Sequence, residues 1–359
     1  MLDDDLDAAR PTSEHQTVLV TGGAGFFGGI LKQRLLDEGF DCVSIDLHSD
    51  ATTHPRLQNV HGDIRDESLM DRLFSEHRFS AVFHCAAILA HAVTDENFLW
   101  TSNVDGTEVV ARQAVKHAVK KIVFTSSNCL WGNSMHRPVR EDDTPDPVEI
   151  YGRSKWEAEK VLMRYRGGVD SVVFRCPTII DSGRLGLLAI LFDFIREGRK
   201  VWVVGDGGNR YQFVYAPDVA DACLLAMRRS GSAVYNVGSD KVRSLQEIYE
   251  YTIAQAGTGA RVASLPKMPT LAAMRLASAL KVSPLGPYHW RMISEDFEFD
   301  TTKVKTELGW QPSVTNEQML AEAYKSYERD YDEIQARTDV SAHRQPAKMG
   351  AIRVLKWLS

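Results

Sequence analysis

The 359-residue sequence is poor in several features that mark large protein classes. It has five cysteines, an odd number, spread along the chain without a Cys-x-x-Cys pair, which argues against a disulfide framework and a cysteine zinc site. Its histidines show no metal-ligand spacing, so we expect no metal. No apolar run approaches the length of a membrane span. Residues 1–14 are acidic and have no apolar core, so we expect a disordered tail rather than a secretory signal.

The chain also lacks an excess of basic residues. Its net charge is -6, with 44% apolar and 25% charged residues, so we expect no nucleic-acid partner and a large buried core. The scattered cysteines fit a reducing cytosol, so we expect a cytoplasmic protein. A chain of this length exceeds one average domain. Strand-like runs at residues 18–20, 43–45, 59–61, 81–84, 122–125 and 171–175 alternate with helix-like stretches at 30–38, 103–117 and 155–165. This alternation predicts an α/β fold with a doubly wound parallel sheet.

The most informative segment is the glycine-rich turn at residues 21–28, which follows the first strand-like run. Gly22, Gly25 and Gly28 provide the tight turn and the close approach of backbone to phosphate that a dinucleotide needs at a helix N-terminus. A second strand-like run ends in Asp46, at the distance expected for an acid that binds ribose hydroxyls. No basic residue follows Asp46 directly, which favours NAD over NADP.

A second group of residues could perform proton chemistry. Tyr151 and Lys155 are four residues apart on a predicted helix, which places the phenol and the ammonium on one face. A nearby cation favours the phenolate and makes tyrosine a usable acid or base. Ser127 closes a strand-like run and could bind the reacting oxygen, although a role in the following turn is equally natural. Asn103 could act as a helix cap or as a polar contact near the cofactor.

Together these motifs resemble the extended short-chain dehydrogenase/reductase superfamily, in its NAD-dependent epimerase/dehydratase branch. The resemblance covers residues 17 to about 221 and continues more weakly through 299–300 and 308–312. It implies a Rossmann-like domain, in which Ser127, Tyr151 and Lys155 are catalytic, with Asn103 beside them. The further residues that it implies for NAD binding are Phe26, Phe27, Asp63, Ile64, Ala86, Ala87 and Pro177. For the substrate it implies Ser127, Asn128, Tyr151 and Arg210, whose guanidinium could hold a diphosphate.

The resemblance also divides the chain. We predict an NAD-binding domain at 15–176 and 210–238, a smaller mixed α/β substrate-binding domain at 177–209 and 239–335, and a C-terminal extension at 336–359. The apolar stretch 271–280 is expected to be core more often than a pocket wall. The basic and apolar segment 349–358 could lie on a membrane surface, but we expect it to dock on the protein. Relatives pair two helices from each subunit, so we expect a homodimer through residues 103–117 and 155–165.

Several reactions fit these residues. Dehydratases of this branch usually place an Asp-Glu pair after the active-site hydroxyl, and here Asn128 and Cys129 follow Ser127, which disfavours dehydration. An epimerase that transiently oxidises a sugar hydroxyl, most naturally on a nucleotide sugar, needs only Ser127, Tyr151 and Lys155. The alternative is an NAD(P)-dependent dehydrogenase or reductase of a small alcohol or ketone, like the 3β-hydroxysteroid dehydrogenase and dihydroflavonol reductase relatives. A nucleotide sensor without catalysis is disfavoured by the intact catalytic set.

Overall fold

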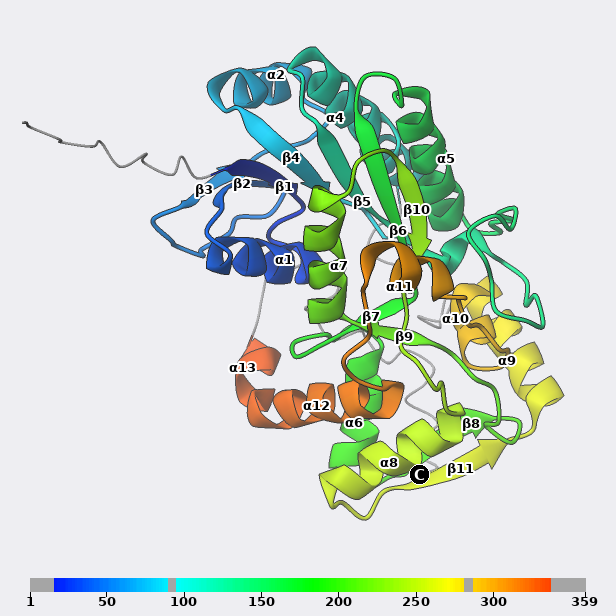
Figure 1. Cartoon of the computed structure of the whole chain (residues 1–359). Coiled ribbons are helices and arrows are strands. Elements are labelled where there is room, and N and C mark those ends of the chain that lie inside the picture. The colour runs from blue at the N-terminus through cyan, green and yellow to red at the C-terminus, as the bar shows by residue number, and fades with distance from the viewer. Residues whose placement is uncertain (1–15, 90–94, 281–286, 337–359) are drawn as a thin grey trace, which may run out of the picture.

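The computed structural model describes residues 16–89, 95–280 and 287–336. Within these residues the chain forms a seven-stranded sheet in the order β10-β6-β5-β4-β1-β2-β3, and every neighbouring pair of strands is parallel. Helices cover both faces of this sheet (Figure 1). The predicted doubly wound α/β fold is therefore confirmed. The strands are β1 Thr17–Thr21, β2 Asp41–Asp46, β3 Leu57–His61, β4 Phe79–His84, β5 Lys121–Ser127, β6 Asp170–Cys176 and β10 Ala233–Asn236.

The sheet is buried on both faces because its strands are apolar at consecutive positions. In β1 the side chains of Val18 and Val20 point to one face and that of Leu19 to the other, and all three are fully buried. Such continuous apolar runs are typical of parallel strands covered by helices on each side. One face packs against α1 Phe26–Asp37, α7 Ala216–Arg228 and α11 Thr302–Leu308. The other packs against α2 Glu67–Glu76, α4 Asp105–Lys116 and α5 Ile150–Arg164.

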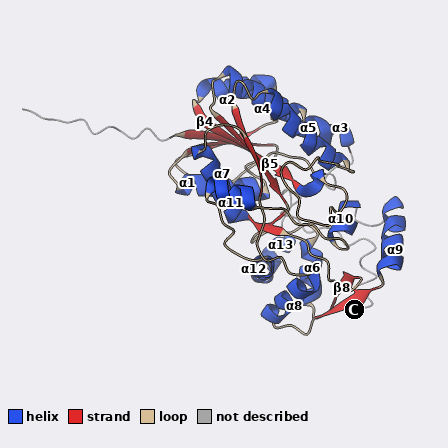
Figure 2. Ribbon diagram, turned by 45° about the vertical axis from the view of Figure 1, so that its right-hand side comes forward, coloured by secondary structure: helices blue, strands red, loops and turns tan. Residues whose placement is uncertain are grey.

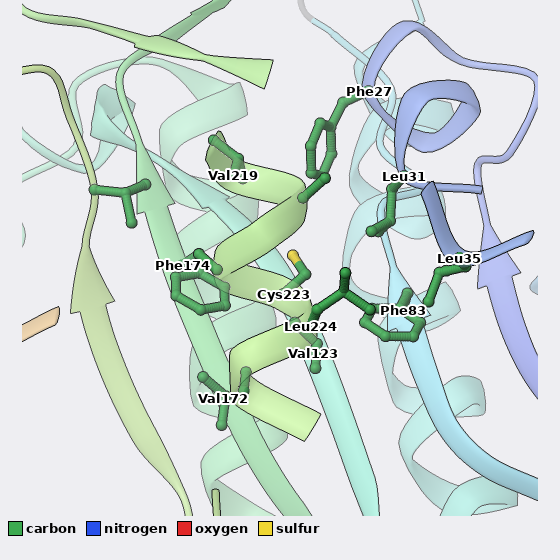
Figure 3. Close-up of a cluster of buried hydrophobic side chains, with 14 of the residues drawn as sticks. Phe27, Leu31, Leu35, Phe83, Val123, Val172, Phe174, Val219, Cys223 and Leu224 are labelled. Atoms are coloured by element: carbon green, nitrogen blue, oxygen red, sulfur yellow. The ribbon is translucent and has the colours of Figure 1, made fainter. Parts of the chain in front are cut away.

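Helix α7 shows how a late segment of the chain completes the first face. Its side chains Val219, Cys223 and Leu224 project toward the strand residues and toward Phe27 and Leu31 of α1 (Figure 3). The sheet therefore takes elements from both before and after residue 200.

A second apolar cluster, centred on Phe192, Tyr324 and Tyr327, lies among the elements below the carboxyl ends of the strands (Figure 1). Two short parallel pairs contribute to this part, β7 with β9 and β8 with β11. The strands are β7 Thr178–Ile180, β8 Lys200–Val204, β9 Phe213–Tyr215 and β11 Arg261–Leu265. The helices are α6 Leu188–Arg196, α8 Leu245–Ala256, α9 Lys267–Ala279, α10 Pro287–Met292, α12 Asn316–Arg329 and α13 Tyr331–Ala336. The mixed α/β character expected for the smaller part agrees with these elements.

The structure differs from the sequence predictions at two helices. The helix predicted at 103–117 corresponds to α4, but the sequence did not predict α3, Glu96–Asn103, which precedes it and is separated from it at Val104. The interpretation of 271–280 as core is wrong, because α9 contains no buried residue. Apolar spacing predicts a helix but does not say what packs against it. The acidic tail at 1–14 and nearly all of the extension 336–359 lie outside the described residues.

Two further sequence expectations concern absences. Among the helices that the structure describes, none combines the length and the hydropathy required to cross a bilayer. Likewise, no group of three metal-ligating side chains is found in the described ranges.

Candidate active site

The glycine-rich turn joins β1 to α1 at the carboxyl edge of the sheet. Gly22 has φ +74°, and a Cβ atom there would lie 2.7 Å from the backbone nitrogen of Ala86. A Cβ atom on Gly28 would lie 2.1 Å from the carbonyl oxygen of Gly22. Both positions therefore require glycine, and the close approach of Ala86 explains why a small-residue segment follows β4. The first amides of α1 face this turn and form the type of cradle that binds a pyrophosphate.

Asp46, at the end of β2, is held against the same turn. Its carboxylate accepts hydrogen bonds from the backbone N–H groups of Ala24 (3.0 Å) and His48 (2.8 Å), and its side chain is 11% exposed. A carboxylate in this place suits the hydroxyls of an adenosine ribose and repels a 2′-phosphate. The glycine turn and Asp46 together fit NAD.

The other residues predicted for NAD binding lie around this turn. Phe26 and Phe27 open α1 with their side chains in the core, so only their backbone can face a ligand. The carboxylate of Asp63 accepts a hydrogen bond from the Arg65 guanidinium at 2.6 Å. Burial acts to raise the pKa of Asp63, but the hydrogen bonds from Arg65 outweigh it and hold this pKa below its usual value. The three remaining residues predicted for NAD binding lie next to the elements described above. Ile64 packs against Gly106 of α4, Ala87 follows Ala86, and Pro177 joins β6 to β7.

Helix α5, which carries Tyr151, packs closely against the segment that follows Ser127 at the end of β5. The Ser127 hydroxyl accepts a hydrogen bond from the N–H of Cys129 at 3.1 Å and caps the short 3-10 helix η1, Asn128–Leu130. Gly152 of α5 lies against this helix so closely that a Cβ atom there would be 2.1 Å from the Cys129 carbonyl oxygen. The turn that carries Tyr151 therefore packs directly on the segment that follows Ser127.

Lys155 lies one turn further along α5 and is 2% exposed. Its ammonium sits over the Phe124 ring, 3.9 Å from the centroid, and burial lowers the pKa of Lys155 to about 8. Burial, with the Lys155 charge nearby, also lowers the pKa of His84 to about 3, so His84 is neutral and bonds Thr21 and Thr107. A positive charge in this apolar setting acts strongly on a neighbouring phenol, because little solvent screens it.

Asn103 ends α3 and connects the segment after β4 with the first turn of α5. Its side chain accepts from the Ile88 N–H at 2.7 Å and donates to the Ile88 carbonyl and to the Ser154 hydroxyl, each at 3.0 Å. Ser154 in turn donates to the Tyr151 carbonyl at 2.8 Å. Asn103 thus positions the segment after β4 and the first turn of α5, a role that its place in the sequence did not indicate.

A pocket opens beside Ser127 on the side of the smaller part. Its lining includes Asn128, Trp131, Tyr211 and Arg291. The Trp131 Nε1 and Arg291 Nη1 atoms are buried and make no hydrogen bond with the residues that the structure describes. Two buried donors without a hydrogen bond, both on residues that line one pocket, indicate a ligand rich in acceptors, because burying such donors alone is costly.

Asn128, which the resemblance assigns to substrate binding, lines this pocket and donates to the Tyr211 hydroxyl at 2.5 Å. Arg210 is exposed and does not line the pocket. Its backbone N–H donates a hydrogen bond to the side chain of Asp296, which does line the pocket. The pocket also contains carboxylates that sequence reasoning missed, at Glu149, Glu295 and Asp296. Arg291 was missed as well, because it lies 136 residues beyond Lys155 in the sequence and no local pattern connects positions so far apart.

Behind helix α5 lies a buried ion pair. Arg175 of β6 forms a bidentate interaction with Glu159 of α5, with Nη2 to Oε2 at 2.8 Å, and the two side chains are 3% and 0% exposed. Glu159 also accepts from the Ser126 hydroxyl at 2.5 Å. This network ties β5, β6 and α5 together one residue from Ser127.

A sequence profile described as the NAD dependent epimerase/dehydratase family matches residues 18–238. The chain belongs to this family. It is an NAD-dependent enzyme of the extended short-chain dehydrogenase/reductase type, as the motifs predicted.

Several relatives of this family cover nearly the whole chain. The uncharacterized protein y4nG of Sinorhizobium fredii is 36% identical over 95% of this chain and 86% of its own length. The UDP-glucose 4-epimerase of Mycolicibacterium smegmatis is 30% identical over 86% of this chain and 97% of its own. Among solved structures, UDP-glucose 4-epimerase from Thermotoga maritima with UDP-glucose has a TM-score of 0.74 at 25% identity, covering 88% of this chain and 100% of that one.

Proposed function

We propose that this family member is a nucleotide-sugar epimerase that inverts a sugar hydroxyl through transient oxidation, with UDP-hexoses as the first substrates to test. The observation that carries the proposal is the pocket beside Ser127, with the unpaired donors of Trp131 and Arg291 and three carboxylates. Phosphate oxygens suit the guanidinium, and sugar hydroxyls suit the carboxylates. The UDP-glucose 4-epimerases among the relatives support the same substrate class.

In this proposal Tyr151 moves the proton of the reacting hydroxyl. The Lys155 ammonium stabilises the phenolate, so the tyrosine oxygen can accept the proton when the hydroxyl is oxidised and return it afterwards. Ser127 holds the same sugar oxygen by a hydrogen bond. NAD, when bound to the glycine turn and Asp46, supplies the hydride-transfer chemistry. The division of the chain into two domains, the homodimer through α4 and α5 and the cytoplasmic location stay predictions.

The proposed function is tested by the fate of the cofactor and by the product. We expect the purified protein to release stoichiometric NAD on denaturation and to convert UDP-glucose into UDP-galactose without added cofactor, because an epimerase regenerates its NAD in each turnover. Mass analysis of the released nucleotide and chromatography of the sugars measure both. An empty site with nicotinamide absorbance that changes during turnover would favour the dehydrogenase alternative instead.

Replacing Arg291 with glutamine should raise the KM for the nucleotide sugar by roughly 10- to 100-fold, because a hydrogen bond to a charged group is worth about 1.5–3 kcal/mol. The kcat should change much less, since Arg291 belongs to α10 and not to the helix that carries Tyr151 and Lys155. The matched control is Arg210→Gln, which removes an exposed guanidinium outside the pocket lining. A large KM increase for Arg210→Gln with none for Arg291→Gln would reverse this assignment.

A further inference from the structure

Helix α9 exposes an apolar face that no described part of the protein covers. Met268, Leu276 and Leu280 are 77%, 62% and 63% exposed, the highest values among the exposed large hydrophobic residues of the described chain. Positions 268, 272, 276 and 280 are four residues apart and so lie along one side of the helix. The opposite side, with Leu271 and Met274, is half-buried. The exposed side of the helix is therefore as apolar as its packed side.

The charged residues of the chain segment that carries this face have one sign. From Tyr251 to Leu280 the chain contains Arg261, Lys267 and Arg275 and no Asp or Glu, in a protein whose net charge is -6. Arg261, Lys267 and Arg275 are exposed. A basic rim beside exposed leucines complements an anionic surface with an apolar interior.

The position of α9 suits contact with a broad surface. Figure 2 shows the helix at the outer edge of the smaller part, away from the main sheet. Its exposed stripe runs for about 20 Å along a convex helix, so it offers a ridge rather than a groove. A ridge of this kind fits the headgroup region of a bilayer better than it fits a folded partner, whose standard interface needs roughly 800 Å² per side.

We propose that α9 binds the enzyme peripherally to anionic lipid bilayers, with Met268, Leu276 and Leu280 inserted among the headgroups and Lys267 and Arg275 beside the lipid phosphates. This role is separate from the proposed catalytic function. Helix α9 packs against α10, which carries Arg291 of the pocket. The bound bilayer would therefore lie one helix away from the pocket lining.

The test is co-sedimentation of the full chain with vesicles made of equal parts phosphatidylcholine and phosphatidylglycerol. We expect binding that is at least tenfold weaker for Leu276→Gln/Leu280→Gln, because the buried apolar area sets the affinity. Arg275→Gln should weaken binding about fivefold, as one basic residue near such a surface contributes about 1 kcal/mol. Val115→Gln, which alters an exposed apolar side chain on α4, should bind as the wild type does. Vesicles of phosphatidylcholine alone should bind much less protein.

Three outcomes would overturn the proposal. The wild-type chain could fail to sediment with anionic vesicles. The double variant could bind as the wild type does while a chain ending at residue 348 does not, which would assign binding to the C-terminal segment. Finally, Leu276→Gln/Leu280→Gln could abolish self-association in sedimentation velocity without any vesicle binding, which would make this face a contact between copies. Circular dichroism and the epimerisation assay, done on each variant, separate loss of folding from loss of binding.

Discussion

Replacing Tyr151 with phenylalanine should lower kcat by about 10²- to 10⁴-fold, the range over which a positioned acid or base contributes. The substitution removes one oxygen and keeps the ring, so the packing of α5 on η1 through Gly152 stays intact. Retained NAD and the thermal midpoint of unfolding should therefore match the wild type. Initial rates of UDP-hexose epimerisation, measured beside the NAD content, check both expectations.

The matched control for this change is Tyr165→Phe. Tyr165 follows the same helix at its other end, where its hydroxyl bonds Glu108, and about 20 Å of helix separates it from Tyr151. Its loss should leave kcat within about twofold of the wild type, since no transition-state interaction is removed. If Tyr151→Phe were as active as the wild type, Tyr151 would be excluded as the acid or base. If neither protein had activity, the nucleotide-sensor alternative would be favoured.

The second large effect is expected on stability, from Glu159→Gln. This change leaves the Arg175 guanidinium buried, at 3% exposure, without its carboxylate. An uncompensated buried charge costs about 3–5 kcal/mol, a large fraction of the 5–15 kcal/mol that holds typical domains folded. Urea-induced unfolding at neutral pH should show a midpoint well below that of the wild type. Contacts of Arg175 with Trp131 and the Glu141 carbonyl remain, so they limit the loss but do not replace the carboxylate.

Two controls separate the buried charge from a general effect of removing carboxylates. Glu322→Gln breaks an exposed pair with Lys325, whose side chains are 63% and 50% exposed, and should cost at most about 1 kcal/mol. The double variant Glu159→Leu/Arg175→Met removes both charges together and should be more stable than Glu159→Gln. A double variant that is less stable than the single one would show that the pair itself, and not the orphaned charge, supplies the stability.

The parts of the site that the sequence predicted are those governed by local rules. The turn with Gly22 and Gly28 follows a strand directly, and Asp46 ends the next strand, so spacing along the chain sufficed to place them together. Tyr151 and Lys155 share one helix face for the same reason. In each case the partners are neighbours in sequence or on adjacent parallel strands, whose carboxyl ends meet at one edge.

The residues that the sequence missed act across long distances in the chain. Arg291 lines the pocket with Asn128, and Arg175 pairs with Glu159 from a different element. Asn103 was expected near the cofactor, but its bonds to Ile88 and Ser154 make it a link between the segment after β4 and the helix of Tyr151. No local pattern predicts such contacts, because the sequence around a single arginine or asparagine looks the same whether that residue is exposed or buried.

By itself, then, the sequence determined the doubly wound sheet, the glycine turn with Asp46 beside it, and the helix that carries Tyr151 and Lys155, because hydrophobic periodicity and glycine requirements act over a few residues. Only the tertiary structure decided which side chains close the pocket and which helix face stays uncovered. Helix α9 has the periodicity of a core helix, yet no segment packs on Leu276 or Leu280 among the described residues. Burial depends on what the rest of the chain brings to a surface, and that is a property of the folded molecule alone.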